Sequence, residues 1–268
     1  MDNKVLNIIE KLKQNYNSDL SIEELKILYG VDIFDYQIYI DTEEYRQKRN
    51  MYEDLSKIYG KEHVARTPQE ITEDTICFVG DALIIDKILP TYNLRYIYGN
   101  LHYNLYEIYN LENLEKIYGS AWFELIKSAK GLENLIEILG SSHFNNLKSA
   151  LGLDSLRIIG NRAGFSNLED SKGLENLEII YDSANFENLK STEYMTCLKQ
   201  IKGHAFFCNL ESALGLENLE CIEGFASFDS LKDAKGLEHL NCVSSMQSFG
   251  EDGLSLDEFR KNCISLKR

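Results

Sequence analysis

The sequence predicts an α/β repeat solenoid of about nine coils, each 21 residues long with one parallel strand, behind a helical N-terminal cap. Two observations predict this fold class. An L-x-x-L-x-x-[IV] phrase returns at a constant step of 21 residues, and its copies begin at Leu111, Leu132, Leu153, Leu174, Met195, Leu216 and Leu237. Each phrase is followed by an alternation of apolar or small residues. Repetition without insertion is typical of coils that bury their apolar side only by stacking on one another.

The strand of each coil is predicted from this alternation. In the first strong repeat, every second position is apolar or small: Ile117, Gly119, Ala121 and Phe123. A period of two is that of a strand with one buried face. Weaker copies of the pattern at residues 78–84 and 94–103 extend the count to about nine strands.

Two recurring residue types predict how the coils are joined. Asn can bond backbone groups one coil away, and it recurs in two columns: Asn113, Asn134, Asn176 and Asn218, then Asn146, Asn167, Asn188 and Asn209. Gly closes most coils, where a left-handed or crowded backbone excludes a side chain; the column is Gly131, Gly152, Gly173, Gly215 and Gly236. Tyr194 and Cys197 break these columns, so we expect an irregular coil around residues 192–200.

The L-x-x-L-x-x-I phrase feeding a short strand resembles bacterial leucine-rich repeats, and the I-x-G-x-A-x-F strand also resembles receptor L-domain-like repeats. The resemblance covers roughly residues 76–250. The chain departs from the family because G-x-A-x-F replaces the usual L-x-L core followed by Asn, and no long helical segment fits inside a coil. The resemblance implies a curved or flattish right-handed solenoid that binds proteins, with no catalytic residues to carry over.

The repeat is flanked by two segments of different character, so three domains are predicted: 1–75, 76–250 and 251–268. The first contains a helical apolar face from Val5 to Leu12, a capping box at Ser21 and Glu24, and a long helix from Thr42 to Tyr59. It is interpreted as a helical cap over the first coil, and the alternative is an independent module with its own partner. Residues 251–268 predict a short C-terminal capping helix.

Composition limits the classes of protein that remain. The 268 residues are 44% hydrophobic with a net charge of −15, and no apolar run is long enough to span a bilayer. We expect a soluble, cytoplasmic protein without a cofactor, since no hydrophobic signal region follows Met1 and the six cysteines are scattered. Cys221 and Cys242 hold the same place in adjacent coils, near disulfide distance, but a reduced state is the simpler interpretation. The richness in Asn, Lys, Ile and Tyr indicates a bacterium with an AT-rich genome.

The outward side of the strands is the candidate partner surface. Uniform solenoids carry small polar or charged residues there, but this chain has aromatic ones, which are the usual anchors of binding energy. They are Tyr98, His102, Tyr118, Trp122, His143, Tyr181, His204, Phe206 and Phe225. The alternative is that stacking between neighbouring strands hides part of this stripe. His102 and His143 are expected to lie two coils apart, about 10 Å, which is too far for one metal ion.

The predicted function is non-enzymatic binding of a protein partner through this strand face. No G-x-S-x-G, phosphate-binding loop, H-E-x-x-H or dinucleotide motif occurs in the chain. One alternative is an acidic mimic of nucleic acid, since the charge itself disfavours binding DNA or RNA. Against it, a column of Lys127, Lys148, Lys190 and Lys232 is interrupted by Glu169 and Glu211, as on an ordinary solvated face. The other alternative is a small enzyme in the N-terminal segment, and self-association through the aromatic stripe is left open.

Overall fold

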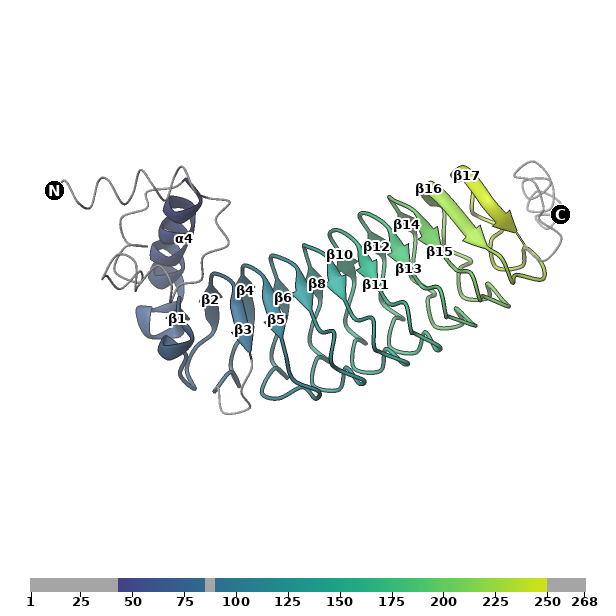
Figure 1. Ribbon diagram of the computed structural model, residues 1–268. Coiled ribbons are helices and arrows are strands. Elements are labelled where there is room, and N and C mark those ends of the chain that lie inside the picture. Colours follow the sequence, from purple (N-terminus) through teal and green to yellow (C-terminus); the bar gives the residue numbers. More distant parts are fainter. Residues whose placement is uncertain (1–42, 85–89, 250–268) are drawn as a thin grey trace, which may run out of the picture. The chain divides into compact units, whose positions relative to one another are not determined.

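The computed structural model describes residues 43–84 and 90–249 (Figure 1). The chain divides into two compact units, 1–53 and 54–268. The second unit contains the parallel solenoid, and the single α-helix of the described residues, α4 (Glu43–Tyr59), precedes the coils. The predicted fold class is confirmed, as is the long helix ending at Tyr59. The predictions at Val5–Leu12, Ser21, Glu24 and 251–268 lie outside the described residues.

Most coils carry two short strands, and equivalent strands form two columns along the stack (Figure 1). The first column contains β2 (Cys77–Val79), β4 (Tyr96–Tyr98), β6 (Lys116–Ile117), β8 (Glu137–Ile138), β10 (Ile158–Ile159), β12 (Ile179–Ile180) and β14 (Gln200–Ile201). The second contains β3 (Ala82–Ile84), β5 (Leu101–Tyr103), β7 (Ala121–Trp122), β9 (Ser142–His143), β11 (Ala163–Gly164), β13 (Ala184–Asn185) and β15 (Ala205–Phe206).

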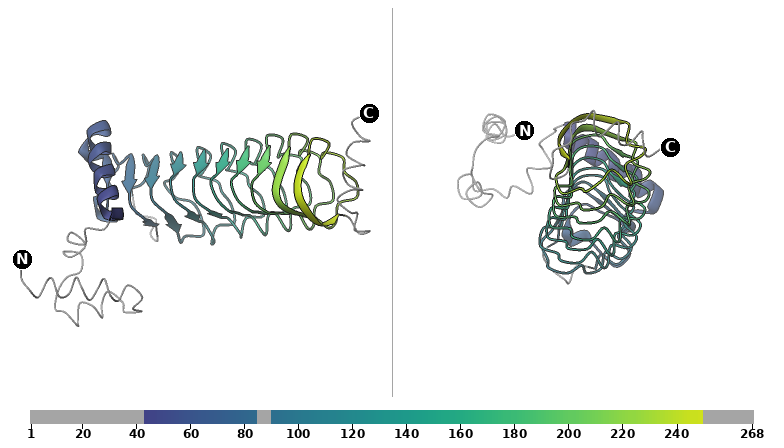
Figure 2. Two further views of the ribbon diagram at one scale, coloured as in Figure 1. Left: turned by 90° about the horizontal axis from the view of Figure 1, so that it is seen from above. Right: turned by 90° about the vertical axis from the view of Figure 1, so that its right-hand side faces the viewer.

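Both columns merge at the C-terminal end of the stack. There β16 (Cys221–Phe228) pairs with both β14 and β15, and β17 (Cys242–Phe249) pairs with β16. From β2 onward, the first column together with these two strands contains nine strands within the described residues. These strands pair in parallel and join equivalent residues, as Ile117 with Ile138 shows, except that the register between β16 and β17 shifts after Ile222. The coils therefore overlie one another when viewed along the stack (Figure 2).

A bend divides the single strand that the alternation predicts. At this bend Gly119 approaches the preceding coil so closely that a Cβ atom would lie 2.5 Å from the carbonyl oxygen of Gly99. The next backbone N–H, that of Ser120, donates to the side-chain Oδ1 of Asn100 at 2.8 Å instead of to a backbone carbonyl. The strand ladder is therefore interrupted for a residue or two and resumes in β7.

The core is made of columns of identical residues. Ile117, Ala121 and Phe123 have no exposed surface, and the same holds at the equivalent positions of the following coils. The phenylalanines stack through the interior, with ring centroids 4.9 Å apart for Phe123–Phe144 and 5.3 Å for Phe144–Phe165. The stack continues through Phe186, Phe207 and Phe228. Each coil thus completes the burial of its neighbours, as the constant repeat predicts.

The predicted Asn and Gly columns both have structural roles. Asn176 Nδ2 donates to the carbonyl oxygen of Asp154 at 2.7 Å, one coil earlier, and Asn134 and Asn218 form the same contact with Glu112 and Thr196. In the second Asn column, equivalent bonds reach back to the preceding coil from Asn146, Asn167 and Asn188. The closing glycines have φ from +93° to +102° at positions 131, 152, 173, 215 and 236.

The irregularity expected around residues 192–200 is confined to the turn. Tyr194 does not adopt the positive φ of the Gly column. The turn is held instead by Thr192, whose Oγ1 donates to the carbonyl oxygen of Leu214 at 3.0 Å. The strand register is unbroken, since β14 pairs with both β12 and β16.

The solenoid begins earlier than the expected boundary at residue 76. Before this boundary lies β1 (Val64–Ala65), between two 3₁₀ helices, Lys61–His63 and Pro68–Glu70. This strand pairs in parallel with β2, and both of its residues are buried. At the end of α4, Leu55 is buried and the ring of Tyr59 lies 6.2 Å from that of Tyr96. The repeat motif missed β1 because this strand lacks the Leu phrase.

Candidate functional site

The nine candidate partner-binding residues lie at three places on the strands. Contacts between their rings group eight of them into three clusters and leave Tyr181 separate. One column follows the isoleucines of the first strand column: Tyr98, Tyr118 and Tyr181. Another lies on the second strand column: His102, Trp122, His143 and Phe206. His204 lies at the bend between β14 and β15, and Phe225 lies within β16. The stripe is therefore not one continuous surface.

The first cluster is a tyrosine stack. The rings of Tyr98 and Tyr118 are 4.2 Å apart at an angle of 15°, and Tyr96 lies 6.5 Å from Tyr98. Burial, followed by the hydrogen bond with Tyr118, raises the pKa of the Tyr98 phenol. The Tyr98 hydroxyl therefore remains protonated at neutral pH.

The second cluster is a flat sandwich of three rings. Trp122 lies between His102 at 4.2 Å and His143 at 5.3 Å, with planes within 2° and 6° of parallel. All three side chains are partly exposed. The indole separates the two imidazoles, so a metal ion bonded at about 2 Å to each ligand cannot reach both. Among the described residues, no group of three or more His, Cys, Asp or Glu side chains could hold a metal ion.

The pKa of His143 in this sandwich is shifted by its surroundings. Burial lowers its pKa, the nearby Arg162 lowers it further, and Glu124 acts in the opposite direction. The imidazole is therefore neutral at physiological pH. At that pH His143 adds no charge to the sandwich, and the cation of Arg162 lies nearby.

The third cluster gathers around Phe225. Its ring lies 4.1 Å from that of His204 and meets Phe206 edge-on at 5.0 Å, with an angle of 88°. The backbone N–H of Phe225 also donates to Nδ1 of His204 at 3.1 Å. His204 is exposed while the two phenylalanines are partly buried, so much of this cluster stabilises the sheet.

Two lysines from the face itself cover the outward tyrosines in part. Lys202 places its ammonium 4.4 Å from the centre of the Tyr181 ring, and Lys116 lies 4.8 Å from that of Tyr118. Lys116 also forms an ion pair with Glu137. Even so, Tyr118 and Tyr181 remain among the exposed large apolar residues of the structure.

Sequence reasoning missed Leu139, which belongs to the same column as these tyrosines. The backbone N–H groups of Tyr118, Leu139 and Tyr181 donate to isoleucine carbonyls of the preceding coil at 2.8, 2.9 and 2.9 Å. Gly160 makes the equivalent bond to Ile138 and presents no side chain. We call this set the Tyr118 row: Tyr98, Tyr118, Leu139, Gly160 and Tyr181. The 21-residue offset from Tyr118 could have identified Leu139, but only aromatic residues were selected.

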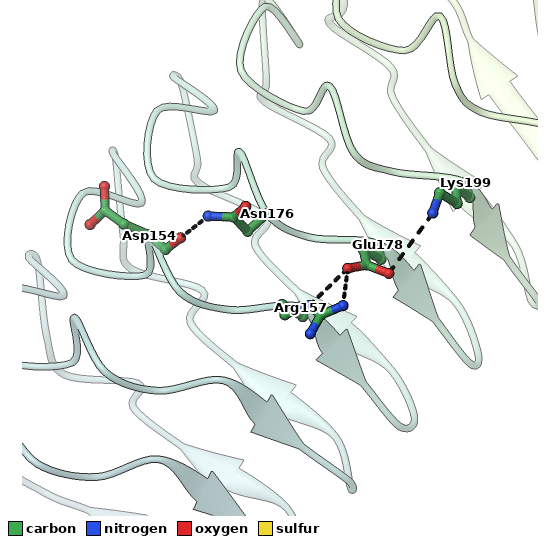
Figure 3. A network of polar contacts seen from close by, with 5 residues as sticks. All are labelled: Asp154, Arg157, Asn176, Glu178 and Lys199. Carbon is green, nitrogen blue, oxygen red and sulfur yellow. Dashed lines mark hydrogen bonds and ion pairs between the residues drawn. The ribbon is translucent and has the colours of Figure 1, made fainter.

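Charged side chains beside the strands are paired with one another. Glu178 accepts hydrogen bonds from Arg157 at 2.7 and 2.5 Å, and its other oxygen lies 4.0 Å from Lys199 (Figure 3). The figure also shows the bond from Asn176 to Asp154 on the adjoining turn. Arg95 and Glu115 form a similar pair at 3.5 Å. These networks join neighbouring coils and leave no continuous row of carboxylates at this edge of the described strands.

A polar groove follows the turns after the phenylalanine column. It is lined by the second Asn column and by the mixed column of lysines and glutamates. Lys148 bonds Glu169 at 2.8 Å and Lys232 bonds Glu211 at 3.2 Å. Part of the expected mixture of charges therefore forms pairs between coils, and Lys127 and Lys190 add two further cations to the lining of the groove.

Comparison with known proteins gives no significant match. No protein-family model matches the chain, and neither a curated protein nor a solved structure is significantly similar to it. No helix in the described residues is long and apolar enough to cross a membrane. The class of protein defined here is a parallel β-solenoid with a partly exposed aromatic strand face.

Proposed function

We propose that this protein is a non-enzymatic interaction scaffold that binds a protein partner through the Tyr118 row. The observation that carries the proposal is the exposure of three large apolar side chains in one register: Tyr118 at 39%, Leu139 at 38% and Tyr181 at 45%. Exposed apolar side chains on a rigid sheet favour association, because burying them against a partner releases water at little cost in backbone entropy.

The row also offers a complementary shape. Gly160 leaves an interval without a side chain between Leu139 and Tyr181, which lie two coils apart, or about 10 Å by strand spacing. An apolar side chain of the partner fits this interval and contacts both neighbours. Lys202 and Lys116 lie beside the row, so they offer hydrogen-bond donors at its rim. His102, Trp122 and His143 extend the surface along the second strand column.

The rival proposal of a nucleic-acid mimic is less well supported. A mimic requires regularly spaced carboxylates without intervening cations, whereas Glu169, Glu211 and Glu178 each pair with a lysine or arginine. We keep the leucine-rich-repeat kinship and a cytoplasmic setting as part of the proposal. The repeated Leu phrase supports the first, and the free thiols of the described cysteines support the second.

The test compares three forms of the chain in affinity capture from a lysate of the source organism. The first is the intact chain, and the second carries Tyr118→Ser, Leu139→Ser and Tyr181→Ser. The third is a matched control with Leu151→Ser and Leu214→Ser, which removes equally exposed apolar side chains, at 46% and 41%, from turns outside the strands. Circular dichroism first establishes that all three are folded.

We expect one protein to be captured by the intact chain and by the control, and to be lost with the strand-face variant. Direct titration of that protein then gives the loss of affinity, which we expect to reach about 100-fold if two anchors are removed. Equal capture by all three forms contradicts the proposal. Binding that disappears between about 0.1 and 1 M salt, with no effect of the serine changes, favours the mimic instead.

A further inference from the structure

Cys221 and Cys242 begin the last two strands of the described solenoid. They are direct partners in the parallel pairing of β16 and β17, which lie side by side in Figure 1. Residues in register on adjacent parallel strands project to the same side, with backbones about 4.8 Å apart. This separation falls within the Cα–Cα range of about 4.4–6.8 Å in which disulfides form.

The side chains around this pair show the spacing that the register imposes. Along the same stack, the rings of Phe207 and Phe228 are 5.4 Å apart and lie within 1° of parallel. Those of His204 and Phe225 are 4.1 Å apart. Two thiols in register can thus approach each other by rotation about their Cα–Cβ bonds, without a change of strand pairing.

The two thiols differ in access to solvent. Cys242 is exposed and Cys221 is partly buried. Burial, followed by the neighbouring thiol of Cys242, raises the pKa of Cys221 to about 12. Because the thiolate is the attacking species, Cys242 is placed to meet a dissolved oxidant first and Cys221 to react second.

Among the described cysteines, this pair alone occupies equivalent positions in adjacent coils. Cys77 pairs with Val64 and Tyr96, and Cys208 lies in a turn, where its Sγ is 3.8 Å from the hydroxyl of Ser227. Cys197 stands in the Asn column. These three provide internal comparisons for any reaction of the pair.

We propose that Cys221 and Cys242 are a redox modification site. A reversible disulfide forms between the two cysteines by exchange with a low-molecular-weight disulfide such as oxidised glutathione. The Cys242 thiolate attacks one sulfur of the oxidant, whose S–S bond breaks, and one thiolate leaves and takes up a proton. Cys221 then loses its proton to solvent and attacks Sγ of Cys242, which releases the second thiol. Two protein thiols are oxidised and one disulfide is reduced to two thiols.

The bond joins the last described strand to the preceding coil. It restricts opening of β17, because the chain between the two cysteines becomes a closed loop. We expect amide hydrogen exchange in residues 242–249 to slow by roughly tenfold or more on oxidation. Exchange in the central coils, such as that of β10, is expected to be unchanged.

The test incubates the reduced full-length chain with oxidised glutathione, blocks residual thiols and digests with trypsin. We expect peptide 203–232, blocked at Cys208, to be joined to peptide 236–260, with a mass two hydrogens below the sum of the blocked peptide and its partner. The first peptide also contains Cys208, so its fragmentation must place the bond at Cys221. The Cys208→Ser variant is expected to form the same bond, and Cys221→Ser is expected to retain a mixed disulfide at Cys242.

Three results would overturn the proposal. They are a bond from Cys242 to Cys208 or to Cys263, which lies outside the described residues, a mixed disulfide that persists in the intact chain, and thiols that stay free. The pH dependence gives a second readout, which does not depend on how well a variant folds. Closure of the mixed disulfide should accelerate about tenfold per pH unit across the neutral range, since burial raises the pKa of the attacking thiol, Cys221, well above that range.

Discussion

The indole of Trp122 and the imidazole of His102 stack with centroids 4.2 Å apart and planes only 2° from parallel. Since His143 covers the other face of the indole, Trp122→Ala removes two ring contacts at once. We expect a loss of about 2 kcal/mol in the free energy of unfolding, because aromatic pairs contribute beyond the area they bury. Trp122→Phe keeps a ring between the histidines and should lose less than half as much. Urea unfolding followed by circular dichroism measures both, and equal stability of the two variants would show that the stack contributes nothing.

The depressed pKa of His143 predicts how stability depends on pH. Burial holds the folded-state pKa of His143 below its usual value of 6.5, so the unfolded chain binds more protons as the pH falls through that value. The contribution of His143 is therefore complete above about pH 6.5 and declines as the pH falls toward the folded-state pKa. Unfolding at several values between about pH 7.5 and 5 should show a steeper loss in the native chain than in His143→Asn. A titration midpoint for His143 above 6.5, measured by NMR, would reverse the sign of this prediction.

The buried hydroxyl of Ser142 predicts a stabilising substitution. Its side chain is fully buried between Ala121 and Ala163 of the adjacent coils, and Oγ has no hydrogen-bond partner among the described residues. Ser142→Ala removes an unpaired polar group and should stabilise the chain by about 1 kcal/mol. Ser183→Ala is the contrasting control, since the Ser183 hydroxyl bonds Asp182 and the backbone N–H of His204. Thermal unfolding of both variants checks the opposite signs, and a less stable Ser142→Ala would mean that the hydroxyl is satisfied.

Much of this fold can be predicted from the sequence because each coil repeats the same pattern of buried positions. Ile117, Ala121 and Phe123 are buried where the alternation places them. The bend after Ile117 is not predicted, since it depends on how closely two backbones approach and on a side-chain oxygen from another coil. The 21-residue repeat predicts which aromatic residues share a column, but it does not predict how exposed each side chain is. Lys202 covers part of Tyr181 while Leu139 remains exposed, and both outcomes depend on residues one coil away.

Two glycines with positive φ, one in the column that closes the coils and one between β2 and β3, predict different costs of adding a methyl group. At Gly215 the backbone has φ +102°, and a Cβ atom would lie 1.9 Å from the carbonyl oxygen of Thr192. At Gly80 the φ is +128°, but the nearest atoms are 3.9 Å away. Gly215→Ala should therefore lose about 3 kcal/mol or more, and Gly80→Ala about 1–2 kcal/mol from backbone strain alone. Chemical denaturation separates the two cases, and equal losses would show that overlap with the neighbouring coil is relieved freely.

The break in the Asn column at Cys197 predicts a gain of stability on repair. In neighbouring coils Asn176 and Asn218 each donate to a carbonyl 22 residues earlier, at 2.7 Å. Cys197→Asn places an amide within reach of the equivalent carbonyl, that of Glu175, and should add about 1 kcal/mol. The reverse change, Asn176→Cys, leaves the Asp154 carbonyl without this donor and should lose a similar amount. The urea midpoints of both variants test this prediction. Hydrogen bonding between coils predicts that the two midpoints shift in opposite directions. If the Asn side chains only fill space, both shifts should be near zero.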